Sequence, residues 1–355
     1  MLIYYHHKNR PYLITRSLDP DNQESPIHFL RSRIISSEYT YRRNHFAYPL
    51  ITPENFIFSI SGQVSTPLTF HYYDLLKMPS KTIKMVLECA GNKRAMFEPR
   101  TFGEQWKDGA VTQGVWKGVP LTALLSMTGI KADAQEVVFE GFDAGKRKDM
   151  EETVPFARSL PLQSAFHPDI LVAYEYNNQP LSYKHGFPFR LIVPRWYAMA
   201  SVKWLKKITV INRPFYGPFQ TIDYVYYSKD NSEKKRPVTY MNVNSIIQQP
   251  LDYSVQDERY HLIYGIAWSG KGRISKGEIS FDQGKKWDPV ILDRSQEGPY
   301  SWTPWHYLWK EARKGEYIIL LRASDSTGRV QPEKPDWNKK GYGYNAISKV
   351  HIKIE

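Results

Sequence analysis

The chain changes character once, at a polar stretch late in the sequence. Residues 228–237 read Ser-Lys-Asp-Asn-Ser-Glu-Lys-Lys-Arg-Pro and show no hydrophobic periodicity, which is typical of a linker. At 355 residues the chain is long enough for two domains. We therefore expect a first domain over residues 1–235 and a second over residues 236–355.

The second domain shows a pattern of short strands. Apolar runs at 261–268, 278–281, 287–292 and 317–323 are separated by glycine-bearing turns such as Asp282-Gln283-Gly284. Strands at such spacing predict an antiparallel β-sandwich of about 110 residues.

The first domain mixes element types. Residues 68–78 and 121–127 fit short helices. The strands that we expect lie at 82–87, 136–139, 170–174 and 190–193. The predicted fold class of this domain is therefore α+β.

The whole chain has one cysteine, Cys89. A single thiol excludes an internal disulfide framework, a Cys-based zinc site, a Cys-ligated iron–sulfur cluster and a c-type haem attachment. The thiol ends an apolar run and is followed by Ala-Gly-Asn and then Lys93 and Arg94. Nearby cations lower the pKa of a thiol, and the thiolate is a nucleophile and a metal ligand. The alternative is that Cys89 is a small buried hydrophobe.

The chain is basic, with a net charge of +12 and a pI of about 9.4, so we expect an anionic partner. Basic clusters with histidines lie at residues 41–46 and 184–190, and further cations follow at Arg195 and Lys203. Together they could converge on a phosphate-bearing cofactor, although each alone is typical of a solvated face. A nucleic-acid-binding protein is the rival interpretation. Against it, Lys and Arg are interleaved with Asp and Glu, and no nucleic-acid motif occurs.

Neither an apolar run of about 18 residues nor a signal-peptide pattern occurs in the sequence. We therefore expect a cytoplasmic protein that does not interact with membranes.

Several motifs in order resemble the sulfite oxidase family. In the first domain these are Arg-Asn-His at 43–45, Cys-Ala-Gly-Asn-Lys-Arg at 89–94, His-Gly-Phe-Pro-x-Arg at 185–190 and Val-Lys-Trp-Leu at 202–205. In the second domain they are Ala-Trp-Ser-Gly at 267–270 and Trp-Asn-x-Lys-Gly at 337–341. The resemblance covers residues 40–355. It implies a molybdopterin-binding domain followed by an immunoglobulin-like dimerisation domain, and hence a homodimer.

The resemblance also implies roles for individual residues. Cys89 would ligate molybdenum, and a thiolate is a suitable soft ligand for that metal. Arg43, Arg94 and Lys340 would hold the substrate oxyanion, with Lys340 replacing a family arginine, and Trp106 would shape the pocket. The residues expected to bind the cofactor are Asn44, His45, Ala110, His185, Arg190, Arg195, Ser201 and Lys203.

Two departures from the family pattern stand out. Phe156 falls where the family has its active-site tyrosine, and an alternative register places Met150 there, so we expect the phenol to be missing. Ala200 stands where many members have an arginine, and Arg195 is the candidate replacement.

The resemblance therefore predicts a molybdenum-cofactor-dependent oxidoreductase. It would oxidise sulfite to sulfate by oxygen-atom transfer at a Cys-ligated molybdenum centre, without haem, and pass electrons to an external acceptor such as a cytochrome or oxygen. One alternative is a molybdopterin-dependent reductase of a sulfoxide or other small oxide. The other is a non-enzymatic basic binding protein.

Overall fold

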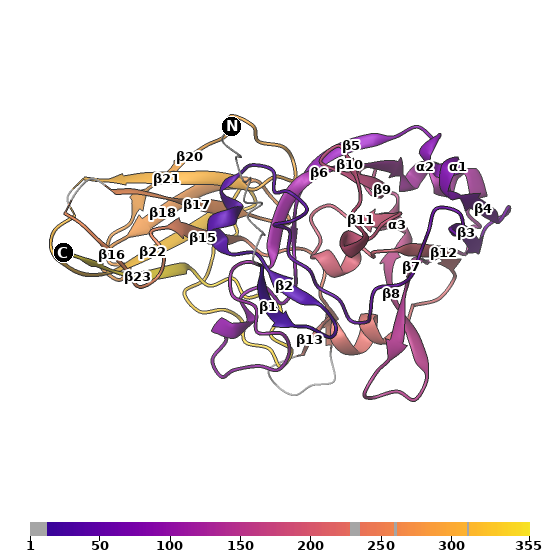
Figure 1. Ribbon diagram of the computed structural model, residues 1–355, viewed down its shortest axis with the longest axis horizontal. Helices are drawn as coiled ribbons and strands as arrows, with labels where there is room; N and C mark the ends of the chain where they lie inside the picture. The colour runs from indigo at the N-terminus through magenta and orange to yellow at the C-terminus, as the bar shows by residue number, and fades with distance from the viewer. Residues whose placement is uncertain (1–12, 228–234, 259–260, 311) are drawn as a thin grey trace, which may run out of the picture.

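The computed structural model describes residues 13–227, 235–258, 261–310 and 312–355. The chain is mostly β-sheet with few helices. The strands of the second part, residues 244–354, lie at one end of the molecule (Figure 1). Four strands of the first part, residues 13–227, lie at the other end: β3 (Ile57–Gly62), β4 (Leu68–His71), β7 (Glu136–Lys146) and β12 (Leu205–Ile211). Within the described residues the α-helices are short: α1 (Tyr72–Leu76), α2 (Leu121–Thr128) and α3 (Leu162–Ala165). The α+β prediction therefore overstated the helix content of the first part.

Two five-stranded sheets form the first part of the chain. One has the order β10 (Gln179–Pro180), β9 (Leu171–Tyr176), β6 (Val111–Pro120) and β5 (Lys81–Glu88), with β11 (Arg190–Ile192) also paired to β9. The other has the order β4, β3, β12, β7 and β8 (Thr153–Pro161). A large apolar core with members from both sheets lies here. Strand β5 matters most for function, because it ends immediately before Cys89.

Smaller elements complete this part. Two hairpin-like pairs are present, β1 (Ile14–Ser17) with β2 (Asn22–Glu24) and β13 (Val225–Tyr227) with β14 (Lys235–Pro237). Single helical turns are η1 (Ile27–Arg31), η2 (Arg94–Met96), η3 (Tyr183–His185), η4 (Ala198–Ala200) and η5 (Phe219–Asp223), the last of the π type.

Two sheets enclose a separate apolar core in the second part. One has the order β15 (Asn244–Gln249), β17 (His261–Trp268), β21 (Thr303–Trp309) and β20 (Ile291–Leu292). The other has the order β16 (Ser254–Gln256), β23 (Ser348–Ile354), β22 (Gly315–Asp325), β18 (Ile274–Ser280) and β19 (Asp288–Pro289). Strand β16 runs parallel to β23, so the arrangement is not wholly antiparallel as the sequence predicted.

Three local predictions need correction. Only residues 72–76 of the expected helix at 68–78 are helical, because residues 68–71 pair with β3 as strand β4. The expected strand at 287–292 divides between the two sheets at Pro289, whose ring nitrogen cannot donate to a ladder. Residues 228–234 of the expected linker lie outside the described residues, and residues 235–237 form strand β14.

No helix in the described part of the chain is long and apolar enough to cross a membrane.

Candidate active site

A cavity of about 700 Å³, counting space continuous with solvent, opens beside the end of β5. Its lining comes from segments far apart in the sequence, including residues 40–45, the turn after β5, β8 and the segment 184–203. Nine of the residues predicted from sequence meet on this cavity: Arg43, Asn44, His45, Cys89, Phe156, His185, Arg190, Ser201 and Lys203.

Cys89 lies in the cavity wall, directly after the last residue of β5. Its backbone N–H donates to the Ala110 carbonyl at 2.9 Å, and its carbonyl accepts from the Asn92 N–H at 2.9 Å. Burial raises the pKa of the thiol, and Arg43 and Arg94 only partly offset that effect. The expectation that neighbouring cations give a net lowering of this pKa is therefore wrong for the chain alone, because desolvation outweighs them. Lys93 is not among these cations, since its side chain points into the second part of the chain.

The cavity wall is rich in cations, of which Arg190 is buried. Arg42, Arg43, Lys184, Arg190 and Lys203 line it, whereas Asp143 is the one carboxylate among the described lining residues. Arg190 donates to the carbonyls of His185 at 3.0 Å and Ser201 at 3.1 Å, and burial lowers its pKa to about 10. An arginine with that pKa is still charged at neutral pH. The cavity therefore favours an anion.

Lys203 and Asp143 are titratable groups of the cavity wall that attract each other. Burial lowers the pKa of Lys203 and raises that of Asp143, while the attraction between the two opposes both shifts. The ammonium donates to the Arg43 carbonyl at 3.0 Å and to the Asn44 side-chain oxygen. Asn44 thus connects the segment 40–45 to Lys203, the lysine of the Val-Lys-Trp-Leu motif.

The two predicted histidines are neutral in the folded chain. Burial, followed by nearby cations, lowers the pKa of His45 well below its usual value and that of His185 to about 3. His185 Nδ1 lies 2.6 Å from the Ser182 hydroxyl, and its Nε2 lies 3.3 Å from the Thr40 carbonyl.

The phenol that the sequence predicted to be missing comes from another segment. Phe156 does line the cavity and stacks on His45 with ring centroids 5.4 Å apart. Tyr224, which follows helix η5, also lines the cavity, and its hydroxyl lies 2.8 Å from His45 Nε2. Burial raises the pKa of Tyr224, so its O–H remains a donor at neutral pH. The departure at Phe156 therefore does not deprive the cavity of a phenol.

Two predicted residues lie behind the thiol and outside the cavity lining. Trp106 and Ala110 pack with Cys89 and Tyr41 in a small apolar cluster. The Ala110 N–H donates to the Asn92 side-chain oxygen at 3.0 Å, so Ala110 braces the turn through its backbone.

Three predicted cations are also absent from the lining. Arg94 donates from Nε to the carbonyls of Lys340 at 3.1 Å and Gly341 at 3.2 Å, and lies over the Tyr342 ring. The Lys340 ammonium lies 3.7 Å from an Asp223 carboxylate oxygen. These two residues contact each other outside the cavity lining.

Arg195, the candidate replacement for the family arginine at the position of Ala200, does not line the cavity. Its Nη1 donates to the Lys271 carbonyl at 2.7 Å, and its guanidinium lies over the Tyr300 ring. The segment after Pro194 therefore directs this side chain to the second part of the chain.

Sequence reasoning missed Tyr224, Tyr41 and Asp143 as cavity residues. Tyr41 stands beside the Arg-Asn-His motif, so its proximity was a usable signal. Tyr224 and Asp143 lie outside every motif named from the sequence, so nothing local pointed to them.

The cavity residues fit a molybdenum cofactor bound to a phosphate-bearing pterin. Among the described cavity residues, Tyr41 Oη, Arg42 Nε, Asp143 Oδ1 and Arg190 Nε are buried without a partner in the protein. Three of the four can donate, as phosphate and pterin acceptors require. Cys89 would supply the thiolate ligand, and the pocket cations would hold the phosphate.

Comparison with known proteins identifies the class. Residues 45–219 match the oxidoreductase molybdopterin binding domain, and residues 235–355 match the Mo-co oxidoreductase dimerisation domain. By these matches the chain contains a molybdopterin-binding oxidoreductase domain followed by a dimerisation domain.

The individual relatives identify the family. Sulfite oxidase of Arabidopsis thaliana is 31% identical, over 97% of this chain and 94% of that protein. Mitochondrial sulfite oxidase of Drosophila melanogaster is 33% identical over 94% of this chain. The chain spans 62–66% of the length of the matched animal mitochondrial enzymes. The crystal structure of sulfane dehydrogenase SoxCD from Paracoccus pantotrophus superimposes with a TM-score of 0.84 at 26% identity, covering 99% of this chain and 92% of that one. This chain belongs to the sulfite oxidase family.

Proposed function

We propose that this chain binds molybdenum–molybdopterin and oxidises sulfite to sulfate. The observation that supports the proposal most is the meeting of the lone thiol, Arg43, the other cations of the cavity wall and the Tyr224 phenol on one cavity. The reaction consumes water: sulfite and H₂O give sulfate, two protons and two electrons. The cofactor, when bound, supplies the oxygen-atom and electron transfer.

The residues of the chain bind and orient the reactants. Cys89 would hold the metal, and Asn44, His45, His185, Arg190, Ser201 and Lys203 would hold the pterin and its phosphate. Ala110 would brace the cysteine turn, while Arg195 would stabilise the contact with the second domain and not the cofactor.

Arg43 and Tyr224 are the proposed groups for the substrate. Burial lowers the pKa of Arg43, but the interactions with Tyr224 and Cys89 outweigh burial and raise it overall. Arg43 is therefore positively charged at neutral pH. The Tyr224 O–H can donate to a sulfite oxygen, with neutral His45 fixing the position of the phenol. Arg94 and Lys340 would add positive potential from outside the cavity lining, and Trp106 and Phe156 would keep the wall of the cavity dry.

The remaining predictions from sequence belong to this proposal. The first domain would comprise residues 1–235. Residues 236–355 would form an immunoglobulin-like domain through which two copies pair, which the match to a dimerisation domain supports. Electrons would leave to an external cytochrome or to oxygen without haem in this chain, and the protein would act in the cytoplasm.

A second candidate is oxidation of a sulfane sulfur. The likeness to the SoxCD sulfane dehydrogenase along nearly the whole chain favours it. Both candidates use the same cavity and differ in the size and charge of the sulfur compound.

Assays of the molybdenum-loaded protein separate the candidates. Sulfite, thiosulfate as a sulfane donor, and methionine sulfoxide would each be tested, the first two with ferricyanide as acceptor and the last with reduced methyl viologen as donor. Sulfite-dependent ferricyanide reduction that exceeds the thiosulfate rate supports sulfite oxidation. Turnover of thiosulfate alone supports the second candidate, and turnover of the sulfoxide alone would contradict both.

A further inference from the structure

Residues of the second part of the chain form hydrogen bonds to both ends of the turn that carries Cys89. Glu88 and Lys93 flank this turn, and both side chains are buried against residues from β15 and beyond. We infer that Asn244, at the start of β15, is a positioning residue for the Cys89 thiol, because its one amide group holds both flanking charges. Only the expected effect of Asn244 on turnover rests on the proposed function; its effect on the position of the thiol does not.

Glu88 is held on one side by the second domain. Its carboxylate accepts from Trp268 Nε1 at 2.9 Å, from Asn244 Nδ2 at 3.1 Å and from Asn92 Nδ2 at 3.2 Å. The first two donors lie in the second part of the chain, and Asn92 lies in the turn itself. The carboxylate thus ties the start of the cysteine turn to β15 and β17.

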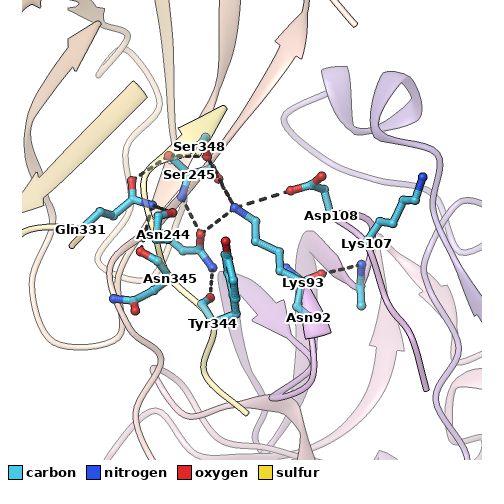
Figure 2. A network of polar contacts seen from close by, with 12 residues as sticks. Asn92, Lys93, Lys107, Asp108, Asn244, Ser245, Gln331, Tyr344, Asn345 and Ser348 are labelled. Atoms are coloured by element: carbon cyan, nitrogen blue, oxygen red, sulfur yellow. Dashed lines mark hydrogen bonds and ion pairs between the residues drawn. The ribbon is translucent and has the colours of Figure 1, made fainter. Parts of the chain in front are cut away.

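Lys93 is held from the same direction (Figure 2). Its ammonium donates to Asn244 Oδ1 at 2.9 Å and to the Ser245 carbonyl at 2.6 Å, with Asp108 at 3.5 Å. Its backbone has a φ of 62°, an unfavourable conformation for a lysine, and its N–H donates to the Lys107 carbonyl at 2.7 Å. The buried contacts of the side chain therefore help to hold a strained backbone position.

Asn244 is suited to both tasks by its chemistry. Its NH₂ group donates to Glu88 and to the Tyr344 carbonyl at 3.0 Å, and its oxygen accepts from Lys93 and from the Ser245 N–H at 2.9 Å. A carboxylate could not donate to Glu88, and an apolar side chain could serve neither partner. Glu88 and Lys93 are each 1% exposed and Asn244 is 0% exposed, so a lost partner would not be replaced by water at the surface.

Cys89 lies in the sequence between Glu88 and Lys93, the two residues that anchor the turn to the second part of the chain. Cys89 directly follows Glu88, and the turn closes through the hydrogen bond from the Asn92 N–H to the Cys89 carbonyl. Loosening either anchor therefore lowers the free energy needed to open the turn. The second domain, by this inference, sets the position of the metal ligand in addition to any part it has in pairing two copies.

The lone cysteine allows a direct test on the full-length, cofactor-free protein. The Cys89 thiolate attacks the disulfide of 5,5′-dithiobis(2-nitrobenzoate), forming a mixed disulfide and releasing one coloured thiolate per chain. We expect Asn244→Ala and Lys93→Met each to raise the labelling rate roughly ten-fold.

A matched control separates positioning from general loosening. Gln331 is buried in the same network and bonds Ser245 Oγ at 2.7 Å and the Ala346 carbonyl at 2.9 Å, but no residue of the cysteine turn. Gln331→Ala should leave the labelling rate within about two-fold of the parent. Equal acceleration in the control, or no acceleration in either turn variant, would overturn the inference. If Asn244→Ala does not fold by circular dichroism, Lys93→Met against the control decides the question.

The loaded enzyme gives a second readout. Asn244→Ala should lower kcat for sulfite while KM changes by less than about two-fold, since the residue does not line the cavity. A rise in KM with unchanged kcat would contradict a role in positioning the metal ligand. The thiol measurement needs neither cofactor nor substrate, so it stays interpretable if sulfite proves not to be the substrate.

Discussion

Replacement of Tyr224 by phenylalanine removes one hydroxyl from the cavity and keeps the ring. The ring stacks on Tyr342 with centroids 5.1 Å apart and lies under the Arg158 guanidinium at 5.5 Å, so its position should persist. Among the described residues, the hydroxyl has one hydrogen-bond partner, His45 Nε2 at 2.8 Å. The substitution therefore isolates what the phenol O–H contributes.

The two consequences differ in size. Loss of one buried hydrogen bond between neutral groups should lower the free energy of unfolding by about 1 kcal/mol. A hydrogen bond to an anion contributes about 1.5–3 kcal/mol, so kcat/KM for sulfite should fall roughly 10- to 100-fold. Activity should thus suffer more than stability.

Steady-state sulfite oxidation by protein of equal molybdenum content measures the effect. Tyr176→Phe is the control, because Tyr176 is a buried phenol that donates to the Ile35 carbonyl at 2.6 Å and does not line the cavity. It should lose similar stability and keep kcat/KM. An unchanged kcat/KM in Tyr224→Phe would refute the assignment of the phenol to the substrate.

Three further predictions address charge, pH and packing. Arg43→Met should raise KM for sulfite at least ten-fold because the anion loses a cation, and an unchanged KM would remove Arg43 from the anion site. In the folded state the pKa of His185 is lowered to about 3, so its imidazole stays neutral at pH 5, whereas in the unfolded state it is protonated below about pH 6.5. Stability should therefore fall by about 2 kcal/mol per chain between pH 7 and pH 5 through this group, and His185→Gln should abolish that part of the slope in urea titrations. A Cβ at Gly109 would lie 1.8 Å from the Ser25 carbonyl oxygen, so Gly109→Ala should destabilise the fold by about 2–3 kcal/mol, and an unchanged urea midpoint would contradict this packing.

Much of the scaffold could be predicted because local pattern and environment agree there. Strand β5 is an apolar run that ends at a small, turn-prone segment, and helix α2 is followed by its C-cap Gly129, whose φ is 63°. The helix predicted for residues 68–71 was wrong because an apolar run of that length is compatible with a strand or a helix. The pairing with β3 makes these residues a strand.

The site residues that belong to sequence motifs could be predicted, whereas those brought to the cavity only by tertiary packing could not. Cys89, Arg43 and Lys203 are far apart in sequence, and a resemblance was needed to bring them together. Tyr224 was missed because Phe156 was given its place, although the cavity contains both rings. The direction of the pKa shift of Cys89 was also missed, since burial outweighs the cations and burial cannot be read from neighbouring residues in the sequence.

The most direct test is the molybdenum content per chain, measured by inductively coupled plasma mass spectrometry on protein from a host that makes molybdopterin. Parent protein and Cys89→Ser would be compared in the same preparation, together with their sulfite oxidation. The account predicts close to one molybdenum per parent chain and no turnover by Cys89→Ser. Parent protein without molybdenum, or Cys89→Ser with parental turnover at equal metal content, would contradict it.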